Sequence, residues 1–123
     1  MSPGLIDMIF PGDTNHHGTL FGGVALAHMD KVAFLAATRH ARAVMVMAAS
    51  DRIDFQSPVR EGEMVELAAE VAMTGRSSVR VRVALWAEDL LTGDRRRAAS
   101  AEFVMVAVGP DGQSQPIAET VRS

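Results

Sequence analysis

The sequence contains no cysteine, which excludes disulfide bonds, thiolate zinc sites and cysteine nucleophiles. It also lacks an excess of basic residues: 12 Lys and Arg stand against 15 Asp and Glu, and the formal net charge is −3. A general nucleic-acid binder needs a basic face, so we expect no nucleic-acid partner. A small local basic patch remains compatible with this charge balance.

Long hydrophobic segments are missing as well. No apolar run approaches the roughly 20 residues that a membrane-spanning helix requires, so we expect no membrane partner. The first ten residues lack the basic start and long apolar stretch of a secretory signal, and we expect a cytoplasmic protein. The 123 residues predict one domain over 1–123. A domain of this size gains from association with a second copy, because it buries only about two-thirds of its unfolded surface.

The first third of the sequence predicts a short strand over residues 5–10, a loop over 11–19 and a helix from about Phe21 to about His40. The helical segment is rich in Ala, Leu and Met, and it ends with Arg39 and His40, which suit the negative end of a helix dipole. Its apolar residues run nearly all round, which predicts a helix buried on most sides.

The rest of the sequence alternates between apolar and polar residues and predicts strands over 44–55, 65–73, 78–88 and 97–108. In the second of these, the alternation places Val71 and Met73 on the inner face. The polar residues from Gly109 onward are expected to be loose. One helix beside a run of strands predicts an α+β domain in which an antiparallel sheet of about five strands wraps around a central helix. The edges of such a sheet favour dimerisation.

Asp30 is the most informative residue for chemistry, because an ionised carboxylate on an apolar helix is costly unless it is paired or faces a cavity. It is a candidate catalytic group. Alternatively it pairs with Lys31, Arg39 or an arginine of a strand, or lies on a narrow solvated face with His28 and Lys31.

Other candidates precede this helix. Gly22 and Gly23 would let a ligand approach the free N–H groups of the first helical turn, which form a ready oxyanion hole, although a glycine pair also simply permits a tight entry. Asn15 has an amide that can orient a water or a carbonyl, or it forms an Asx turn. His16 and His17 are expected to be solvated, because no Cys or further His clusters with them to form a metal site.

Two basic segments follow. The turn Gly75–Arg76–Ser77–Ser78 offers N–H groups, two hydroxyls and a guanidinium, a set that suits phosphate but also fits an ordinary polar hairpin. Arg95, Arg96 and Arg97 are expected to be a solvated charge run. The sequence has no G-x-S-x-G motif, no P-loop and no dinucleotide fingerprint.

Three segments, PGDTNHHGTLFGGVALAHMD (11–30), DRIDFQSPVREGEMVEL (51–67) and TGRSSVRVRVALWAE (74–88), together with the ending AEFVMVAVGPDG (101–112), resemble the hotdog-fold acyl-CoA thioesterases of the YciA and brain types. The resemblance covers nearly the whole chain. It implies hydrolysis of acyl-CoA without a metal or an organic cofactor, by dimers that assemble further into tetramers or hexamers.

By position in these motifs, the resemblance implies that Asp30 and Asn15 are catalytic and that Gly22 or Gly23 supplies the oxyanion donor. It also implies that Gly75, Arg76, Ser77 and Ser78 contact the nucleotide end of CoA. The adjacent His16 and His17 depart from the usual pattern. Two other classes remain open, a hotdog acyl-CoA hydratase or dehydratase that uses a histidine, and a non-catalytic acyl-CoA-binding protein.

Overall fold

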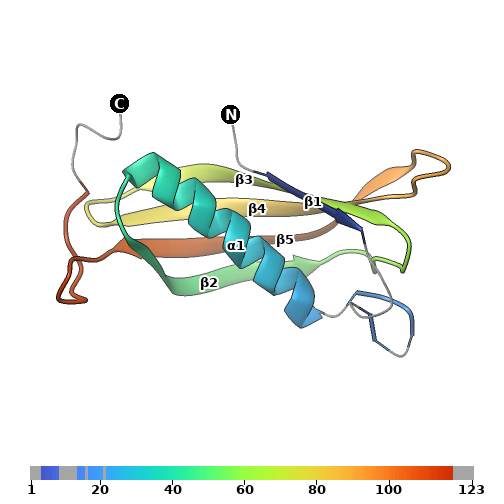
Figure 1. Cartoon of the computed structure of the whole chain (residues 1–123), viewed down its shortest axis with the longest axis horizontal. Helices are drawn as coiled ribbons and strands as arrows, with labels where there is room; N and C mark the ends of the chain where they lie inside the picture. The colour runs from blue at the N-terminus through green and yellow to red at the C-terminus, as the bar shows by residue number, and fades with distance from the viewer. Residues whose placement is uncertain (1–3, 9–13, 16, 21, 118–123) are drawn as a thin grey trace.

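The computed structural model describes residues 4–8, 14–15, 17–20 and 22–117, and of residues 4–8 only the backbone. Residues 9–10 of the predicted first strand, Phe21 and His16 lie outside the described part. The elements follow in the order β1 (Gly4–Met8), α1 (Gly22–Ala41), β2 (Met45–Phe55), β3 (Met64–Thr74), β4 (Ser78–Glu88) and β5 (Arg95–Ala107) (Figure 1). The predicted helix and the four later strands are thus confirmed to within two residues at their ends.

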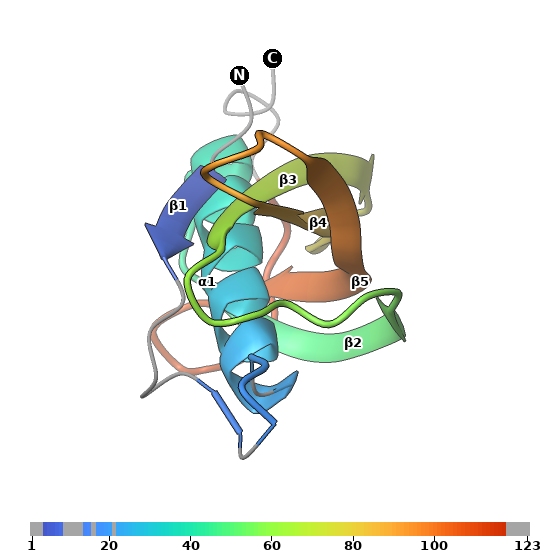
Figure 2. The same cartoon turned by 90° about the vertical axis from the view of Figure 1, so that its right-hand side faces the viewer.

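The strands form one antiparallel sheet in the order β1-β3-β4-β5-β2, so β1 and β2 are its two edges. The sheet curls around α1, with β1 on one side of the helix and β2 on the other (Figure 2). This is the predicted α+β hotdog arrangement, a central helix wrapped by a five-stranded sheet.

The core lies between α1 and the concave face of the sheet. The alternate residues of β4, from Val79 to Leu85, are at most 2% exposed, as are Phe103 and Met105 of β5. The helix contributes Met29 and Val32, together with a series of alanines whose small side chains let it lie close to the sheet. The period-two pattern of these strands therefore predicted their inner faces correctly.

Met73 is an exception, because it was predicted to face inward and is 65% exposed. The pairing of β3 with β4 shifts register between Val71 and Met73, which marks a β-bulge. A single extra residue in one strand reverses the facing of every residue beyond it. The alternation in sequence therefore held up to Val71 and was wrong for the last turn-proximal residues of β3.

The segment after β5 is also more ordered than predicted. Val108 bridges to Ser114, and the N–H of Ile117 donates to the carbonyl of Arg76 at 2.9 Å. The side chain of Ile117 is only 5% exposed and belongs to the core. The expectation of a loose segment from Gly109 was wrong, because one apolar residue in a polar stretch is enough to fasten it to the sheet.

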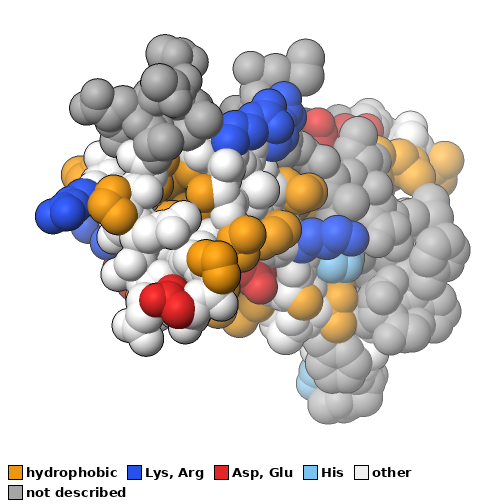
Figure 3. Space-filling model, turned by 60° about the vertical axis from the view of Figure 1, so that its left-hand side comes forward, with side chains coloured by type: hydrophobic (Ala, Val, Ile, Leu, Met, Phe, Trp, Pro, Cys, Tyr) orange, Lys and Arg blue, Asp and Glu red, His pale blue; other side chains and the backbone are white. Residues whose placement is uncertain are grey.

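Part of the apolar surface stays uncovered in one chain. Phe34 and Leu35 on α1 are 42% and 41% exposed, so the helix is not buried on most sides as predicted. Every residue of β2 after Met45 is exposed. Hydrophobic side chains gather visibly on the side of the molecule shown in Figure 3. The part of the chain that the structure describes holds no helix with the length and apolar character of a membrane span.

Candidate active site

The start of α1 is open to a ligand. Gly22 and Gly23 are both exposed, and the first turn carries no acidic side chain. A Cβ added at Gly23 would meet nothing within 4 Å, and one added at Gly22 would meet only the ring of Phe55 at 3.6 Å. The N–H groups of a first helical turn have no partner within the helix. The turn can therefore donate hydrogen bonds to an oxyanion at the positive end of the helix dipole.

Asn15 forms the Asx turn that was one of its two predicted roles. Its Oδ1 accepts the N–H of His17 at 2.9 Å, the N–H of Thr19 at 3.3 Å and the hydroxyl of Thr19 at 3.2 Å. All three bonds use the carbonyl oxygen, so no described residue is bonded to the Nδ2 group. The turn thus fixes Asn15 and leaves its donor available for a water or a carbonyl.

The loop that carries Asn15 is attached to the connection between β2 and β3. The N–H of Leu20 donates to the carbonyl of Val59 at 2.8 Å, and the N–H of Glu61 donates to the carbonyl of Gly18 at 3.0 Å. A cleft of about 350 Å³ opens between this loop, Phe55 and Gly22, with a mostly apolar floor. The helix start therefore lies beside a space large enough for part of a small ligand.

Asp30 lies two turns further along α1, about 12 Å from Gly22 at the usual helical rise. Its side chain is partly buried, and no hydrogen bond or ion pair joins it to another described residue. The alternative that it pairs with Lys31, Arg39 or an arginine of a strand is therefore wrong within one chain. Leu26 and Phe34 flank it at four residues on either side. A partly buried carboxylate without a counter-ion is available to act as a base or a nucleophile.

The predicted phosphate-binding turn lies between β3 and β4. The N–H of Gly75 donates to the carbonyl of Ser78 at 2.8 Å, and a Cβ on Gly75 would lie 2.7 Å from the Ser78 hydroxyl, which would have to rotate away to admit it. Arg76 is exposed. A small polar hollow of about 280 Å³ joins Arg76 and Ser77 to residues 114–116. Sequence reasoning missed this contribution of the C-terminal segment.

One chain does not bring these two groups of residues together. The ring of His40, in the last turn of α1, is hydrogen-bonded to Thr74 at 2.8 Å, which places the Gly75–Ser78 turn beside the C-terminal end of the helix. Gly22 starts the same helix of 20 residues, about 30 Å away along its axis. The predicted oxyanion donors and the predicted CoA contacts therefore lie at opposite ends of the protomer.

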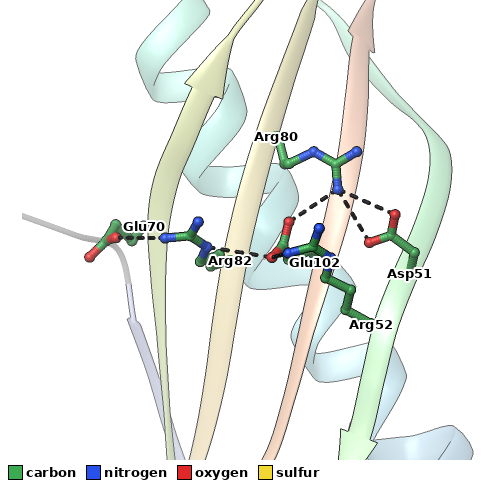
Figure 4. A network of polar contacts seen from close by, with 6 residues as sticks. All are labelled: Asp51, Arg52, Glu70, Arg80, Arg82 and Glu102. Atoms are coloured by element: carbon green, nitrogen blue, oxygen red, sulfur yellow. Dashed lines mark hydrogen bonds and ion pairs between the residues drawn. The ribbon is translucent and has the colours of Figure 1, made fainter.

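A second polar cluster lies on the face of the sheet opposite α1, where Glu102 is only 7% exposed (Figure 4). Its carboxylate bonds to Arg80 at 3.0 Å and to Arg52 and Arg82 at 3.3 and 3.4 Å. The hydrogen bond from Arg80 and the nearby positive charges lower the pKa of Glu102. Asp51 and Glu70 complete the cluster, so three guanidinium groups face three carboxylates.

A bulge makes this cluster possible. The register of β2 shifts between Asp51 and Asp54, and Arg52 adopts a left-handed conformation with φ of 52°. Consecutive residues of a regular strand point to opposite faces, but here Asp51 and Arg52 both reach the outer face. A hollow of about 450 Å³ adjoins Glu102, on the face of the sheet opposite the helix. Its charges are mostly paired, so we assign it no part in the chemistry.

The arginine run of β5 is not the solvated patch that was predicted. Arg96 bonds to Glu63 at 2.7 Å and to the carbonyl of Pro58 at 2.6 Å. Arg95 bonds to Glu66 at 2.7 Å and lies 5.3 Å from the ring centre of Trp86. The first two arginines therefore hold neighbouring strands and the β2–β3 connection, and only Arg97 is free of such bonds among the described residues.

Among the described residues no group of three or more His, Cys, Asp and Glu side chains is placed to hold a metal ion. The expectation that the protein uses no cofactor stays a prediction.

A family model described as the thioesterase superfamily matches residues 17–93, which include Asp30 and the turn at 75–78. The chain belongs to this superfamily. A superfamily member from Bacillus subtilis, named uncharacterized acyl-CoA thioester hydrolase YkhA, is 38% identical over 113 residues, which are 92% of this chain and 66% of that protein. The chain spans 31% of the human cytosolic acyl coenzyme A thioester hydrolase, to which it is 32% identical.

Solved structures of the superfamily agree with the fold. The acyl-CoA hydrolase of Staphylococcus aureus, determined with butyryl coenzyme A and coenzyme A, superposes with a TM-score of 0.89 at 33% identity and covers 94% of this chain and 71% of its own. An acyl-CoA thioesterase described as apo-hexameric gives a TM-score of 0.91 at 36% identity. The match covers 98% of this chain and 81% of that chain. Variants of the Staphylococcus enzyme replace one aspartate and one asparagine by alanine, and these two residues lie fifteen positions apart in that chain.

Proposed function

We propose that this protein is an acyl-CoA thioester hydrolase, releasing a free acid and CoA. One observation carries the proposal: Asp30 lies fifteen residues after Asn15, and no described residue is paired with the carboxylate of Asp30 or bonded to the amide donor of Asn15. The aspartate and asparagine replaced in the Staphylococcus enzyme have the same spacing. The relatives named as acyl-CoA thioester hydrolases support the same reaction.

The reaction begins with the thioester carbonyl hydrogen-bonded to the backbone N–H of Gly22 or Gly23. Charge develops on this oxygen in the transition state, and the helix N-terminus stabilises it. Asp30 takes a proton from water as the water attacks, or attacks the carbonyl itself to form an anhydride that water then hydrolyses. Asn15 orients the water or the carbonyl. In both routes the C–S bond breaks and the thiolate of CoA leaves. It gains the proton that Asp30 took from water in the first route, and a proton from solvent in the anhydride route.

The proposal includes a two-fold dimer formed through β2. This edge strand is exposed along its length after Met45, and an unpaired edge is a template for a second strand. Antiparallel pairing of two copies of β2 would place the Met45 end of one against the Phe55 end of the other. Met45 lies at the helix C-terminus and Phe55 contacts the helix start, so the two groups that one chain separates would meet in the dimer.

Each site would then combine Asp30 and the Gly75–Ser78 turn of one copy with Asn15, Gly22 and Gly23 of the other. Leu35 would be covered at the same seam. Assembly of the dimers into tetramers or hexamers is part of the proposal and is supported by the hexameric thioesterase of similar structure. The proposal also includes a location in the cytoplasm, which the name of the human relative gives for that protein. It further includes activity without a metal or organic cofactor.

The proposal is tested by a thiol-release assay over a panel of saturated acyl-CoA esters of increasing length, with crotonyl-CoA beside butyryl-CoA. We expect release of free CoA from the saturated esters in a buffer that contains a metal chelator. Hydration of crotonyl-CoA without thiol release would instead support the hydratase alternative. Tight CoA binding without turnover of any ester would support the non-catalytic binding protein.

A further inference from the structure

A hollow of about 550 Å³ lies where α1 ends and β2 begins, and its two arginines were not candidate ligand-binding residues in the sequence. It is lined by Phe34, Thr38, Arg39, Arg42, Ala43, Val44 and Met45. Both arginines are exposed, and no hydrogen bond or ion pair joins either guanidinium to another described residue. The three arginines around Glu102, in contrast, are all bonded to carboxylates. The hollow therefore combines free positive charge with apolar walls.

Thr38 supplies a second, independent observation in the same hollow. Its hydroxyl oxygen is buried and has no hydrogen-bond partner. A threonine inside a helix usually bonds back to a carbonyl one turn earlier, so an unbonded hydroxyl requires an explanation. The oxygen is buried in this conformation, so a ligand in the hollow supplies the missing partner once the Thr38 side chain turns toward it.

The hollow lies on the path from the phosphate-binding turn to Asp30. Asp30, Phe34 and Thr38 follow one another at four-residue intervals on one side of α1, and Arg42 is about 18 Å from Asp30 along the axis. On the other side, Met45 pairs with Ala107, whose N–H donates to the carbonyl of Ser77 at 2.8 Å. The hollow and the Gly75–Ser78 turn are therefore about two strand spacings apart, roughly 10 Å.

We propose that Arg39 and Arg42, with the hydroxyl of Thr38, bind a phosphate group of the CoA nucleotide and so position the pantetheine arm along α1 toward Asp30. The inference rests on the proposed function. CoA carries phosphate at two places, the diphosphate and the 3′-phosphate, and guanidinium groups suit either. Phe34 and Val44, which are 42% and 68% exposed, flank the arginines and give an uncharged part of the ligand an apolar surface.

The helix dipole offers another reason for these arginines, because cations stabilise the C-terminal end of a helix. The two roles differ in their consequences. A dipole role changes the stability of the fold and leaves substrate affinity alone, whereas a phosphate role changes affinity and depends on which phosphates the substrate carries.

The test uses the double variant Arg39→Gln/Arg42→Asn, with Asn chosen because Arg42 has a left-handed φ of 52° that Asn tolerates. The matched control is Arg97→Gln, an exposed arginine on another face without a bonded partner among the described residues. KM and kcat are measured with an acyl-CoA, the corresponding acyl-3′-dephospho-CoA and an acyl-pantetheine. The Kd of CoA is measured by calorimetry, and folding is checked by thermal unfolding.

We expect the double variant to raise the KM for acyl-CoA and the Kd of CoA by about tenfold or more, because charge-assisted bonds are lost. The double variant should leave the KM for acyl-pantetheine unchanged. The control variant should leave the KM for acyl-CoA and the Kd of CoA unchanged. Loss of the effect with the dephospho substrate assigns the 3′-phosphate, and its persistence assigns the diphosphate. An unchanged Kd, or an equal rise with all three substrates, would overturn the inference while leaving the hydrolase intact. Wild-type protein that neither binds CoA nor cleaves its esters would overturn the proposed function first.

Discussion

The imidazole of His40 and the hydroxyl of Thr74, 2.8 Å apart, join the last turn of the helix to the end of β3. The bond holds the Gly75–Ser78 turn at the end of the molecule where Arg39 and Arg42 also lie. The residues that we propose to bind phosphate and those that we propose to donate to the oxyanion therefore lie at opposite ends of one long helix. The first prediction follows from this separation.

Replacing Arg76 by alanine should raise the KM for acyl-CoA more than it lowers kcat. Arg76 is exposed beside two serine hydroxyls and far from the thioester, and binding that is equal in the ground and transition states changes KM alone. Steady-state kinetics with acyl-CoA and acyl-pantetheine check this, and the effect should shrink with the shorter substrate. An equal loss with both substrates would show that Arg76 only supports the fold.

Asp30→Asn should reduce hydrolysis about a hundredfold or more while the protein remains folded, because an amide neither accepts the proton of water nor attacks a thioester. Turnover and thermal unfolding are measured on the same preparation. Asp94→Asn is the matched control, since this carboxylate is exposed in the β4–β5 turn, far along the chain from the helix. Near-normal turnover of a folded Asp30→Asn protein would remove Asp30 from the mechanism.

Mixing two inactive variants should restore activity if each site is shared. Asp30→Ala and Asn15→Ala proteins are unfolded reversibly and refolded together. Each mixed dimer then has one site with both lesions and one site with neither, and random pairing makes half of the dimers mixed. About a quarter of the wild-type activity should return. Mixed dimers that are demonstrated by mass spectrometry and remain inactive would show that the site belongs to one chain.

Glu102→Gln should lower the Tm at pH 7, because it leaves three guanidinium groups without their shared carboxylate. The pKa of Glu102 is lowered, chiefly by its hydrogen bond with Arg80, below the ordinary value of 4.5. Its stabilising effect is therefore present above that value and is lost as the pH falls through the lower folded pKa.

The difference in Tm between Glu102→Gln and wild type should accordingly narrow between pH 5 and about pH 3. Glu70→Gln serves as the control, since this carboxylate is 72% exposed at the edge of the same cluster and 4.0 Å from Arg82. If the Tm difference is the same at both ends of this pH range, the carboxylate charge is not what stabilises the cluster.

The elements that the sequence predicted well are those with an uninterrupted pattern. β4 keeps one period throughout, so its valines were placed correctly, and the segment rich in Ala, Leu and Met placed Asp30 on the helix. The failures have local causes. A bulge after Val71 turned Met73 outward, and the single apolar residue Ile117 fastened a polar segment to the sheet.

The site was only partly predictable because its parts are far apart in one chain. The motif around Asn15, Gly22 and Asp30 indicated chemistry by residue type and spacing. The hollow at Arg39 and Arg42 gave no such sign, because basic residues at a helix C-terminus are ordinary in sequence. Only the geometry showed that their charges are free and that Thr38 lies with them.

The balanced cluster around Glu102 has a consequence for how a substrate first approaches the protein. Its three carboxylates cancel the field of three arginines on the outer face, whereas Arg39, Arg42 and Arg76 keep theirs at one end. A polyanion that diffuses toward this acidic protein therefore meets three arginines at that end that are not bonded to any described carboxylate. Association should slow as ionic strength rises, although protein and CoA carry net charge of the same sign.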